Sequence, residues 1–334
     1  MSAPLAHGGR LDEAIARHGG TRGGWLDLST GINPAHYPVP EIPRGAWHDL
    51  PDRVAWEEAA WALRSAMDAP SSAGISLAPG SQAHIHALPR LVRRQDVAIV
   101  GFTYAEHAHA WRREGHGVFA SDGLVSAEAT ARVVVVVNPN NPDGRICDRD
   151  ELLALARRLR QKGGLLVVDE AFGEVTPNAS VADAAGEDGL VVLRSLGKFY
   201  GLAGVRLGAM LCAPRLAADM EELLGPWAVS GPALHVGAAA WNDRTWRVRM
   251  QRKLKGAREE LETMLADGGL TVIGGTDLFV LAEHPKAQAI ADALSERHVL
   301  VRRFARKPDW LRFGLPGGKV AQRRLTKALR EAVG

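Results

Sequence analysis

The chain has 334 residues, of which 46% are apolar and 24% charged, and its formal net charge is +3. This size and balance fit a globular protein with two domains, or one large domain with a smaller one, and argue against a disordered chain. The weak positive charge includes no concentrated basic run of the kind a nucleic-acid face needs, and the longest apolar runs are too short to cross a membrane.

Short valine-rich runs alternate with helical patterns through the middle of the chain. We expect strands at 97–102, 133–138, 165–170, 190–195 and 206–212, and a helix at 149–164. The strand runs are continuously apolar rather than alternating, which indicates strands covered on both faces. This alternation of strands and helices predicts an α/β fold with a doubly wound, mostly parallel sheet.

The two ends of the chain have a different pattern. Residues 1–45 are rich in Gly and Pro with little periodicity, and residues 241–265 predict one long amphipathic helix. After that helix we expect strands at 270–274, 278–283, 299–304 and 310–315, a helix at 287–298 and a terminal helix. The pattern predicts a large domain at 46–240, and a smaller α+β domain with an N-terminal arm formed by 1–45 plus 241–334.

Three polar motifs come directly after three of the predicted strands. They are "NPNNPDG" (Asn138–Gly144), "DEAF" (Asp169–Phe172) and "SLGK" (Ser195–Lys198). Taken singly, each is an ordinary turn or a solvated loop lysine. Because ligands of open α/β sheets bind beyond the carboxyl ends of the strands, the three motifs together predict an amide, a carboxylate and an amine at one site.

An amine, a buried acid and an anion-binding loop suit pyridoxal phosphate. Lys198 would form a Schiff base with the aldehyde, and Asp169 would hold the ring nitrogen protonated, which makes the ring an electron sink. The phosphate group needs backbone N–H groups, a hydroxyl and an arginine. "LAPGSQAHIHAL" (Leu77–Leu88) offers a glycine turn that opens a predicted helix, and Ser195 and Arg206 offer the other two groups.

These motifs, with "SLGKFYGLAGVRLG" in full, resemble the class I and II aminotransferases, which are fold-type I pyridoxal-phosphate enzymes. The resemblance covers nearly the whole chain. It implies that Lys198 is the Schiff-base lysine, that Asp169 pairs with the pyridine nitrogen, and that Tyr104 stacks on the ring. It also implies that Asn141 binds the ring hydroxyl and that the phosphate is held by Ser81, Gln82, Ser195 and Arg206. Phe172 stands where many relatives have a tyrosine, which predicts a more basic Schiff base.

One branch of this superfamily fits the chain best. The opening "HGG", the stretch "LDLSTGINP" and the motifs above resemble the threonine-phosphate decarboxylases of cobalamin synthesis. That resemblance implies decarboxylation of L-threonine O-3-phosphate to (R)-1-amino-2-propanol O-2-phosphate. The alternative is a histidinol-phosphate-type aminotransferase. Gly31 replaces a side chain of the decarboxylase pattern, which bears on the contacts with the substrate phosphate.

A substrate with a carboxylate and a phosphate needs two cationic grips. The resemblance assigns the carboxylate to Arg312, in "WLRFGLPGG", and the phosphate to Arg302. Arg303 is the adjacent alternative, since strand alternation turns only one of the two toward the site. His7 and Asn33 complete the predicted substrate contacts, although a solvated terminal histidine is an equally good interpretation of His7.

The same residues support decarboxylation and transamination, so the motifs alone leave the reaction open. Two other enzyme or ligand classes are disfavoured. The S-x-x-K motif lacks the S-D-N and K-T-G partners of penicillin-binding enzymes, and "GLAGVRLG" lacks the spacing of a dinucleotide-binding loop. A transcriptional regulator built on this fold would need an additional DNA-binding domain, for which 334 residues leave no room.

The cellular setting and assembly are predicted from weaker signals. Cys147 and Cys212 form no C-x-x-C pair, which argues against a disulfide framework or a zinc site and fits a reducing cytoplasm. The first ten residues have no apolar core, so we expect no secretory signal. We expect a cytoplasmic homodimer, because the family usually completes each active site with the neighbouring subunit. We expect no bound metal.

Overall fold

The computed structural model describes residues 8–333, and their contacts divide the chain into two compact units. The large unit holds Tyr37–Asn141 and Arg145–Val248. The small unit holds the described residues up to His36, the short segment Pro142–Gly144, and the chain from Arg249 onward. The units thus change over at 36/37 and 248/249, whereas the predicted domain limits, which stay a prediction, lie at 45/46 and 240/241.

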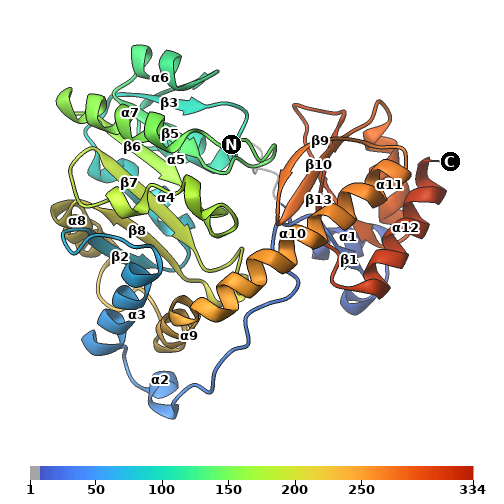
Figure 1. The fold of residues 1–334 in the computed structure, drawn as a ribbon, viewed down its shortest axis with the longest axis horizontal. Coiled ribbons are helices and arrows are strands. Elements are labelled where there is room, and N and C mark those ends of the chain that lie inside the picture. The colour runs from blue at the N-terminus through green and yellow to red at the C-terminus, as the bar shows by residue number, and fades with distance from the viewer. Residues whose placement is uncertain (1–7, 334) are drawn as a thin grey trace. The chain divides into compact units, whose positions relative to one another are not determined.

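The large unit is built on a seven-stranded sheet with the order β2-β8-β7-β6-β5-β3-β4 (Figure 1). Its strands are β2 (Gly74–Ala78), β3 (Asp96–Val100), β4 (Gly117–Ser121), β5 (Val133–Val137), β6 (Leu165–Asp169), β7 (Leu190–Ser195) and β8 (Gly208–Cys212). From β4 to β7 every pairing is parallel, and β8 runs antiparallel to both of its neighbours. The predicted mostly parallel, doubly wound α/β fold is therefore confirmed.

Helices cover the large sheet on both faces. The helices of the large unit are α2 (Arg44–His48), α3 (Arg53–Ala66), α4 (Ser81–Leu91), α5 (Ala105–Arg113), α6 (Leu124–Thr130), α7 (Arg149–Gln161), α8 (Pro214–Leu224), α9 (Gly231–Asn242) and the start of α10 (Arg244–Asp267). Short 3-10 helices lie at Gly173–Val175, Pro177–Ala179, Ala182–Ala184 and Ala203–Val205. Val133 and Val135 pack in one cluster with α4, α5 and α8, while Val134 and Val136, which point the other way, are equally buried. Burial on both faces explains the unbroken valine runs.

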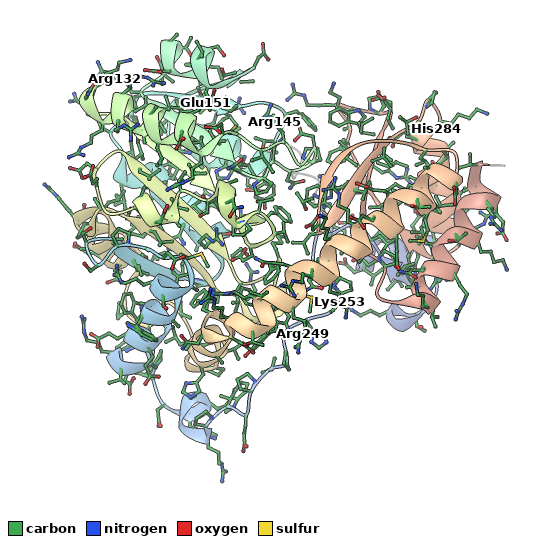
Figure 2. The ribbon with its side chains drawn as sticks, in the orientation of Figure 1. Arg132, Arg145, Glu151, Arg249, Lys253 and His284 are labelled. Carbon is green, nitrogen blue, oxygen red and sulfur yellow. The ribbon has the colours of Figure 1, made fainter. Side chains whose placement is uncertain are left out.

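Capping residues set the helix limits that the periodicity alone located only roughly. The Asp148 carboxylate accepts hydrogen bonds from the backbone N–H groups of Asp150 and Glu151, so α7 begins at Arg149. Figure 2 labels Glu151 on this helix. Asp243 accepts a hydrogen bond from the Trp246 N–H in the same way. It therefore starts a new helix, and the predicted single helix from 241 is wrong at its start, since Trp241 belongs to α9.

The small unit contains a four-stranded antiparallel sheet and a separate two-stranded pairing. The sheet order is β12-β13-β10-β9, and β1 pairs with β11 in parallel. The strands are β1 (Leu26–Asp27), β9 (Thr271–Thr276), β10 (Phe279–Glu283), β11 (Val299–Leu300), β12 (Arg302–Arg303) and β13 (Trp310–Gly314). The helices are α1 (Leu11–His18), a 3-10 turn at Arg22–Gly24, α11 (Ala287–Glu296), α12 (Lys319–Val333) and most of α10. The helix α1 was not predicted.

Two predicted strands differ from those observed. The run 299–304 is not one strand, because β11 pairs with β1 whereas β12 pairs with β13, and the chain changes sheets at the buried Val301. The predicted strand 206–212 begins only at Gly208. Arg206 precedes it with a left-handed backbone, at φ 55°, which ends the preceding 3-10 turn and turns the chain into β8.

The described residues also bear on two further kinds of site. Between residues 8 and 333, no helix is both long and apolar enough to cross a membrane. Over the same residues, no three His, Cys, Asp or Glu side chains are grouped so that they could hold a metal ion.

Candidate active site

The carboxyl ends of β5, β6 and β7 carry the three polar motifs. These strands are adjacent and parallel, so their ends lie at the same edge of the large sheet. Asn141 follows β5, Asp169 is the last residue of β6, and Lys198 follows β7 by three residues. The structure therefore brings the amide, the carboxylate and the amine to one edge, within the large unit alone.

Asp169 is held on both of its carboxylate oxygens. Oδ1 accepts a hydrogen bond from the Ala171 N–H at 3.0 Å, and Oδ2 lies 2.8 Å from Nε2 of His107. Both side chains are almost fully buried. An ionised carboxylate can only accept hydrogen bonds, so His107 must donate from Nε2. This leaves Asp169 firmly oriented as a buried negative charge at the edge of the sheet.

A tight cradle surrounds the N-terminus of α4. Arg206 donates from Nη2 to the Pro79 carbonyl, at 3.4 Å, and from Nη1 to the Ala203 carbonyl, at 3.1 Å. A Cβ on Gly80 would lie 2.6 Å from Arg206 Nη2, and one on Gly208 would lie 2.1 Å from the Ser81 nitrogen. Gly80 has φ 81°, a left-handed conformation that favours glycine, and at Gly208 the backbone of Ser81 leaves no room for a Cβ.

This cradle can bind an anion. The first backbone N–H groups of an eleven-residue helix, among them those of Ser81 and Gln82, have no partners within the helix, and the helix dipole favours negative charge there. Arg206 lies against the same turn. Ser195, buried at the end of β7, accepts a hydrogen bond from the Gly197 N–H, which shapes the loop that leads to Lys198. The donor set fits a phosphate group.

Aromatic and amide side chains complete this edge of the sheet. Nζ of Lys198 lies 5.7 Å from the ring centroid of the buried Phe172. The Tyr104 hydroxyl, just before α5, donates a hydrogen bond to Oε1 of Gln82 at 2.9 Å. The Gln82 side chain is thus turned toward Tyr104. The backbone N–H of Gln82, in the first turn of α4, can still donate to an anion. Asn138 and Asn140 use their side chains to hold the loop that carries Asn141.

Arg312 is the buried cation of the small unit. Its Nη2 donates to the Ser29 carbonyl at 2.9 Å, and its guanidinium carbon lies 4.9 Å from the Phe279 ring centroid. Burial lowers the pKa of Arg312 to about 9, and the positive charge of Arg302 adds to this effect. An anionic ligand beside Arg312 would offset both the burial and the repulsion.

Arg302 and Arg303 face opposite sides of the small sheet. Arg302 lies directly opposite Arg312 across β12 and β13, so both side chains share one face. Arg303 pairs with Leu311 and forms an ion pair with Asp292 of α11 at 2.6 Å. Of the two candidates, Arg302 is therefore the one on the Arg312 side.

The remaining predicted substrate contacts lie near the N-terminus. His7 lies outside the described residues. Oδ1 of the buried Asn33 accepts a hydrogen bond from the Ala35 N–H at 2.8 Å, so this atom shapes a turn. Gly8 must be glycine, since its Cβ would lie 2.2 Å from the Ser29 oxygen, and the Gly9 N–H donates to Ser29 Oγ at 2.7 Å. Ser29 thus joins the "HGG" segment to Arg312.

Comparison with known proteins agrees with this arrangement. The family model "Aminotransferase class I and II" matches residues 51–329. The chain belongs to the class I and II aminotransferase family. A threonine-phosphate decarboxylase from Sinorhizobium sp is 46% identical over 98% of both chains, and one from Pseudomonas aeruginosa is 44% identical over 97% of both. A histidinol-phosphate aminotransferase from Haloferax volcanii is 31% identical, covering 92% of this chain and 88% of its own.

Solved structures show the same aminotransferase fold. Histidinol-phosphate aminotransferase from Sinorhizobium meliloti, in complex with pyridoxal-5'-phosphate, matches with a TM-score of 0.84 at 21% identity, covering 99% of this chain and 95% of its own. The predicted family and fold type are therefore confirmed. The aminotransferase family has a pyridoxal-phosphate-dependent fold.

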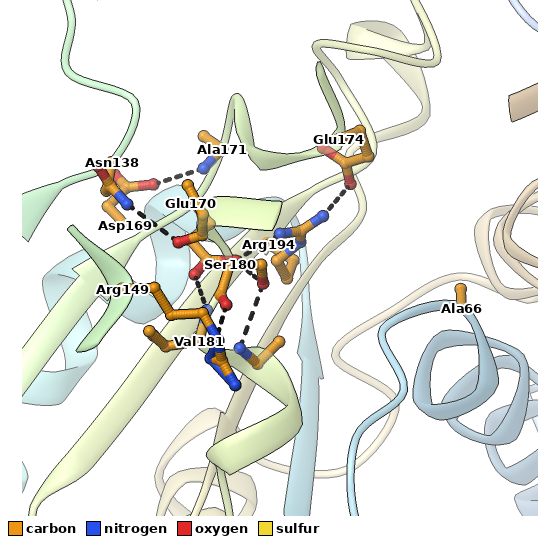
Figure 3. Close-up of polar contacts among 12 residues, drawn as sticks. Ala66, Asn138, Arg149, Asp169, Glu170, Ala171, Glu174, Ser180, Val181 and Arg194 are labelled. Carbon is orange, nitrogen blue, oxygen red and sulfur yellow. Dashed lines mark hydrogen bonds and ion pairs between the residues drawn. The ribbon is translucent and has the colours of Figure 1, made fainter. Parts of the chain in front are cut away.

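A buried ion cluster that was not predicted lies next to Asp169 and Ser195 in the sequence (Figure 3). Nη1 of Arg194 contacts Glu170 Oε2 at 2.5 Å, and its Nη2 contacts Glu174 Oε1 at 3.0 Å. Glu170 also accepts hydrogen bonds from the Ser180 hydroxyl and the Val181 N–H. All three ionic side chains are at most 3% exposed. The cluster joins the end of β7 to the segment after β6.

The charges of this cluster depend on one another. Burial opposes a charge on Arg194, but Glu174 and Glu170 outweigh it and raise the pKa of the guanidinium. Burial raises the pKa of Glu174, against the effect of Arg194. One sequence signal could have revealed the cluster. Arg194 and Glu170 interrupt apolar strand ends, and a buried charge requires a partner. The sequence signal for His107 was weaker: it lies three residues after Tyr104, which at helical spacing places both side chains on one face.

Replacing Arg194 by leucine tests this cluster. The variant leaves two carboxylates buried without their cation, so we expect the free energy of unfolding to fall by about 3–5 kcal/mol. Arg158→Leu is the matched control, because Arg158 forms an ion pair with Glu128 at the surface, and the loss of a surface pair should cost much less. Urea unfolding curves measure both. Equal losses in the two variants would contradict a structural role for the buried cluster.

Proposed function

We propose that this chain is a pyridoxal-phosphate-dependent decarboxylase that converts L-threonine O-3-phosphate to (R)-1-amino-2-propanol O-2-phosphate and CO2, a step of cobalamin synthesis. Relatives that are 46% and 44% identical over nearly the whole chain are threonine-phosphate decarboxylases, which supports the proposal. In the structure, the observation that carries it is the facing pair of arginines on β12 and β13.

Two anionic groups on the substrate match the two arginines. Directly opposed like charges on neighbouring strands repel each other, and here one of them is buried. A ligand with two negative ends offsets this repulsion, and the planar fork of arginine suits both carboxylate and phosphate. In this proposal Arg312 holds the carboxylate and Arg302 holds the phosphate, with Asn33 and His7 as further contacts near the N-terminus.

The cofactor would be held by residues of the large unit. The α4 cradle, with Ser81, Gln82, Ser195 and Arg206, fits its phosphate. Asp169, fixed by His107, would pair with the ring nitrogen, and Lys198 would bind the aldehyde through its amine. Tyr104 and Asn141 would lie against the ring and its hydroxyl. When bound, pyridoxal phosphate withdraws electron density from the substrate's α-carbon, so that a bond to that carbon can break.

The chain's own groups would then direct the reaction. A buried carboxylate such as Asp169 stabilises positive charge at the atom it faces, and His107 keeps it aimed. Lys198, with its amine protonated, could deliver to the α-carbon the proton that takes the place of the departing carboxylate. Arg302 and Arg312 would fix the two anionic ends, and so decide whether the carboxylate or the hydrogen on that carbon is oriented for cleavage.

A histidinol-phosphate-type aminotransferase is the alternative. The same large-unit residues serve both reactions, and such an aminotransferase is 31% identical to this chain. Histidinol phosphate has a phosphate but no carboxylate, whereas the 2-oxoglutarate that would accept its amino group has two carboxylates. The arginine pair therefore suits both reactions, and the higher identity of the decarboxylase relatives favours the decarboxylase.

Paired assays on purified protein test the proposal. We expect L-threonine O-3-phosphate to release CO2 without any oxo-acid acceptor, and Lys198→Ala to lose this activity together with the visible absorbance of the bound cofactor. Turnover of histidinol phosphate with 2-oxoglutarate, in place of CO2 release, would establish the alternative instead. A wild-type protein that takes up no pyridoxal phosphate would refute both.

The pH dependence of the reaction tests the arginine pair. Arg312 is a cation below a pKa of about 9 and loses its proton above it, so kcat/KM for the phosphorylated substrate should fall as the pH rises through about 9. Arg302→Gln removes the neighbouring charge and should move that fall to higher pH, besides lowering kcat/KM. Arg303→Gln, on the opposite face, should keep the wild-type midpoint. A midpoint that is the same in all three proteins would disprove the coupling.

We also propose that the enzyme acts as a homodimer. Four apolar side chains of α2, α3 and the loop between them are each more than 60% exposed, namely Trp47, Leu50, Val54 and Trp61, and we propose that they form an interface patch. Val54 and Trp61 are seven residues apart and share one face of α3. Exposed aromatic clusters of this kind favour a protein interface.

Sedimentation velocity tests the homodimer. We expect the wild-type protein to sediment as a dimer and Trp61→Lys to shift toward the monomer, because a charge in an apolar interface is costly. Val125→Lys is the control, since Val125 is 84% exposed on α6, outside the patch. A monomeric wild-type protein, or a dimer that Trp61→Lys leaves unchanged, would argue against this interface.

A further inference from the structure

A chain of polar contacts leads from Tyr104 to the far side of α4. The Tyr104 hydroxyl donates to Gln82 Oε1 at 2.9 Å, and Gln82 Nε2 lies 2.8 Å from Nε2 of His86. The same His86 nitrogen lies 3.1 Å from Oε2 of Glu106, whose side chain is 10% exposed. Gln82 and His86 are one helical turn apart on α4, while Tyr104 and Glu106 belong to the start of α5.

One nitrogen of His86 therefore faces two groups with opposite needs. The amide NH2 of Gln82 is a donor and requires a lone pair on that nitrogen. An ionised Glu106 is an acceptor and requires a hydrogen on it. The nitrogen cannot satisfy both groups in a single protonation state.

Two arrangements resolve this conflict. With neutral His86 and a lone pair on Nε2, Gln82 keeps the recorded orientation, and Tyr104 donates its hydrogen to Gln82. With a hydrogen on Nε2, in protonated His86 or in the other neutral tautomer, Nε2–H donates to Glu106 and the Gln82 amide turns by half a rotation. That turn is sterically almost neutral, because the two ends of the amide have nearly the same shape. The turned amide presents NH2 to the Tyr104 oxygen, so the Tyr104 hydrogen must point elsewhere.

We infer that His86 is a positioning residue which, through Gln82, sets the direction of the Tyr104 hydroxyl hydrogen. The inference rests on the proposed function in one respect, namely that Tyr104 lies against the bound cofactor. In one state of His86 the hydroxyl hydrogen is held by the protein. In the other state the hydroxyl accepts from Gln82, and its hydrogen is available to a ligand at this edge of the sheet.

Charged neighbours of His86 set the limits of this behaviour. The titratable side chains that the structure places against it are Glu106 and His109, both on α5, and its ring centroid lies 6.3 Å from that of His109. His109 is exposed and makes no recorded contact with Gln82 or Tyr104, so it is the natural control.

Visible circular dichroism of the pyridoxal-phosphate-loaded protein tests the inference, because this signal reports the surroundings of the bound ring. The wild-type signal should change through one titration step that depends on His86. In His86→Gln, a neutral amide can accept from Gln82 and donate to Glu106 at every pH, so the step should be lost while the cofactor stays bound. His109→Gln should retain the step. A step that persists in His86→Gln would overturn the inference.

A double-mutant cycle separates this role from a merely structural one. If His86 acts through the Tyr104 hydroxyl, His86→Gln and Tyr104→Phe should have non-additive effects on the dissociation constant of pyridoxal phosphate, by about threefold or more. Additive effects would overturn the inference. Thermal unfolding of each variant checks that the fold is kept, and the partly exposed His86 is expected to tolerate the change.

The cofactor-free protein provides a measurement that is independent of the proposed function. Nitrogen-15 spectra of labelled histidine report whether His86 Nε2 carries a hydrogen. We expect Tyr104→Phe to shift the titration midpoint of His86, because the hydroxyl favours one Gln82 orientation over the other. An unchanged midpoint would overturn the inference, whether or not the protein binds pyridoxal phosphate. A failure of all proteins to bind the cofactor would instead refute the proposed function.

Discussion

The geometry of the candidate site depends on one buried guanidinium. Arg194, at the end of β7, contacts Glu170 just after β6 and Glu174 in the following turn. These contacts fix the ends of two neighbouring strands relative to each other, and the residues next to them in sequence are Ser195 and Asp169. A buried ion pair is not a strong source of stability, since its desolvation is costly. Its geometric demands make it useful here, because both strand ends must be in place for the pair to form.

The period of two along a strand separates this cluster from the site. Asp169 and Glu170 are consecutive, as are Arg194 and Ser195, so in each pair the side chains point to opposite faces of the sheet. Asp169 points toward α5, where it forms a hydrogen bond with His107, while Glu170 and Arg194 form their ion pair on the other face. The Asp169 carboxylate therefore lies on the side of the site, whereas the Glu170 carboxylate, its neighbour in sequence, is paired with Arg194 on the other face.

Local pattern determined how much of the fold could be predicted. The strands of the large sheet were located well because burial on both faces produces unbroken apolar runs. The convergence of Asn141, Asp169 and Lys198 followed from parallel pairing. The strand 299–304 was mispredicted because its two halves pair with different partners, β1 and β13, and pairing is a property of the whole chain. The α1 helix was missed because a short amphipathic segment lies among glycines.

The candidate site shows the same limit. Alternation predicted that only one of Arg302 and Arg303 faces the Arg312 side, but the choice between them required the register with β13 and the ion pair with Asp292. His107 and the Arg194 cluster depend on contacts between segments distant in sequence, and His107 and Asp169 are 62 positions apart. Spacing within a motif cannot reveal such contacts, whereas a buried charge in an apolar run at least indicates that a partner exists.

The large unit alone cannot decide between the two reactions, because its residues serve any amino-group substrate of the cofactor. In the proposed function the decision lies with Arg302 and Arg312, which hold the substrate's ends and belong to the small unit. Arg312 is tied to the Ser29 carbonyl, and the Ser29 hydroxyl accepts from Gly9 while it donates to Asp27. The "HGG" glycines are therefore explained by close backbone approach to the residue that anchors Arg312. A pair of glycines without functional side chains then has a physical role, because it fixes the residue that anchors Arg312, the arginine that holds the substrate carboxylate in the proposed function.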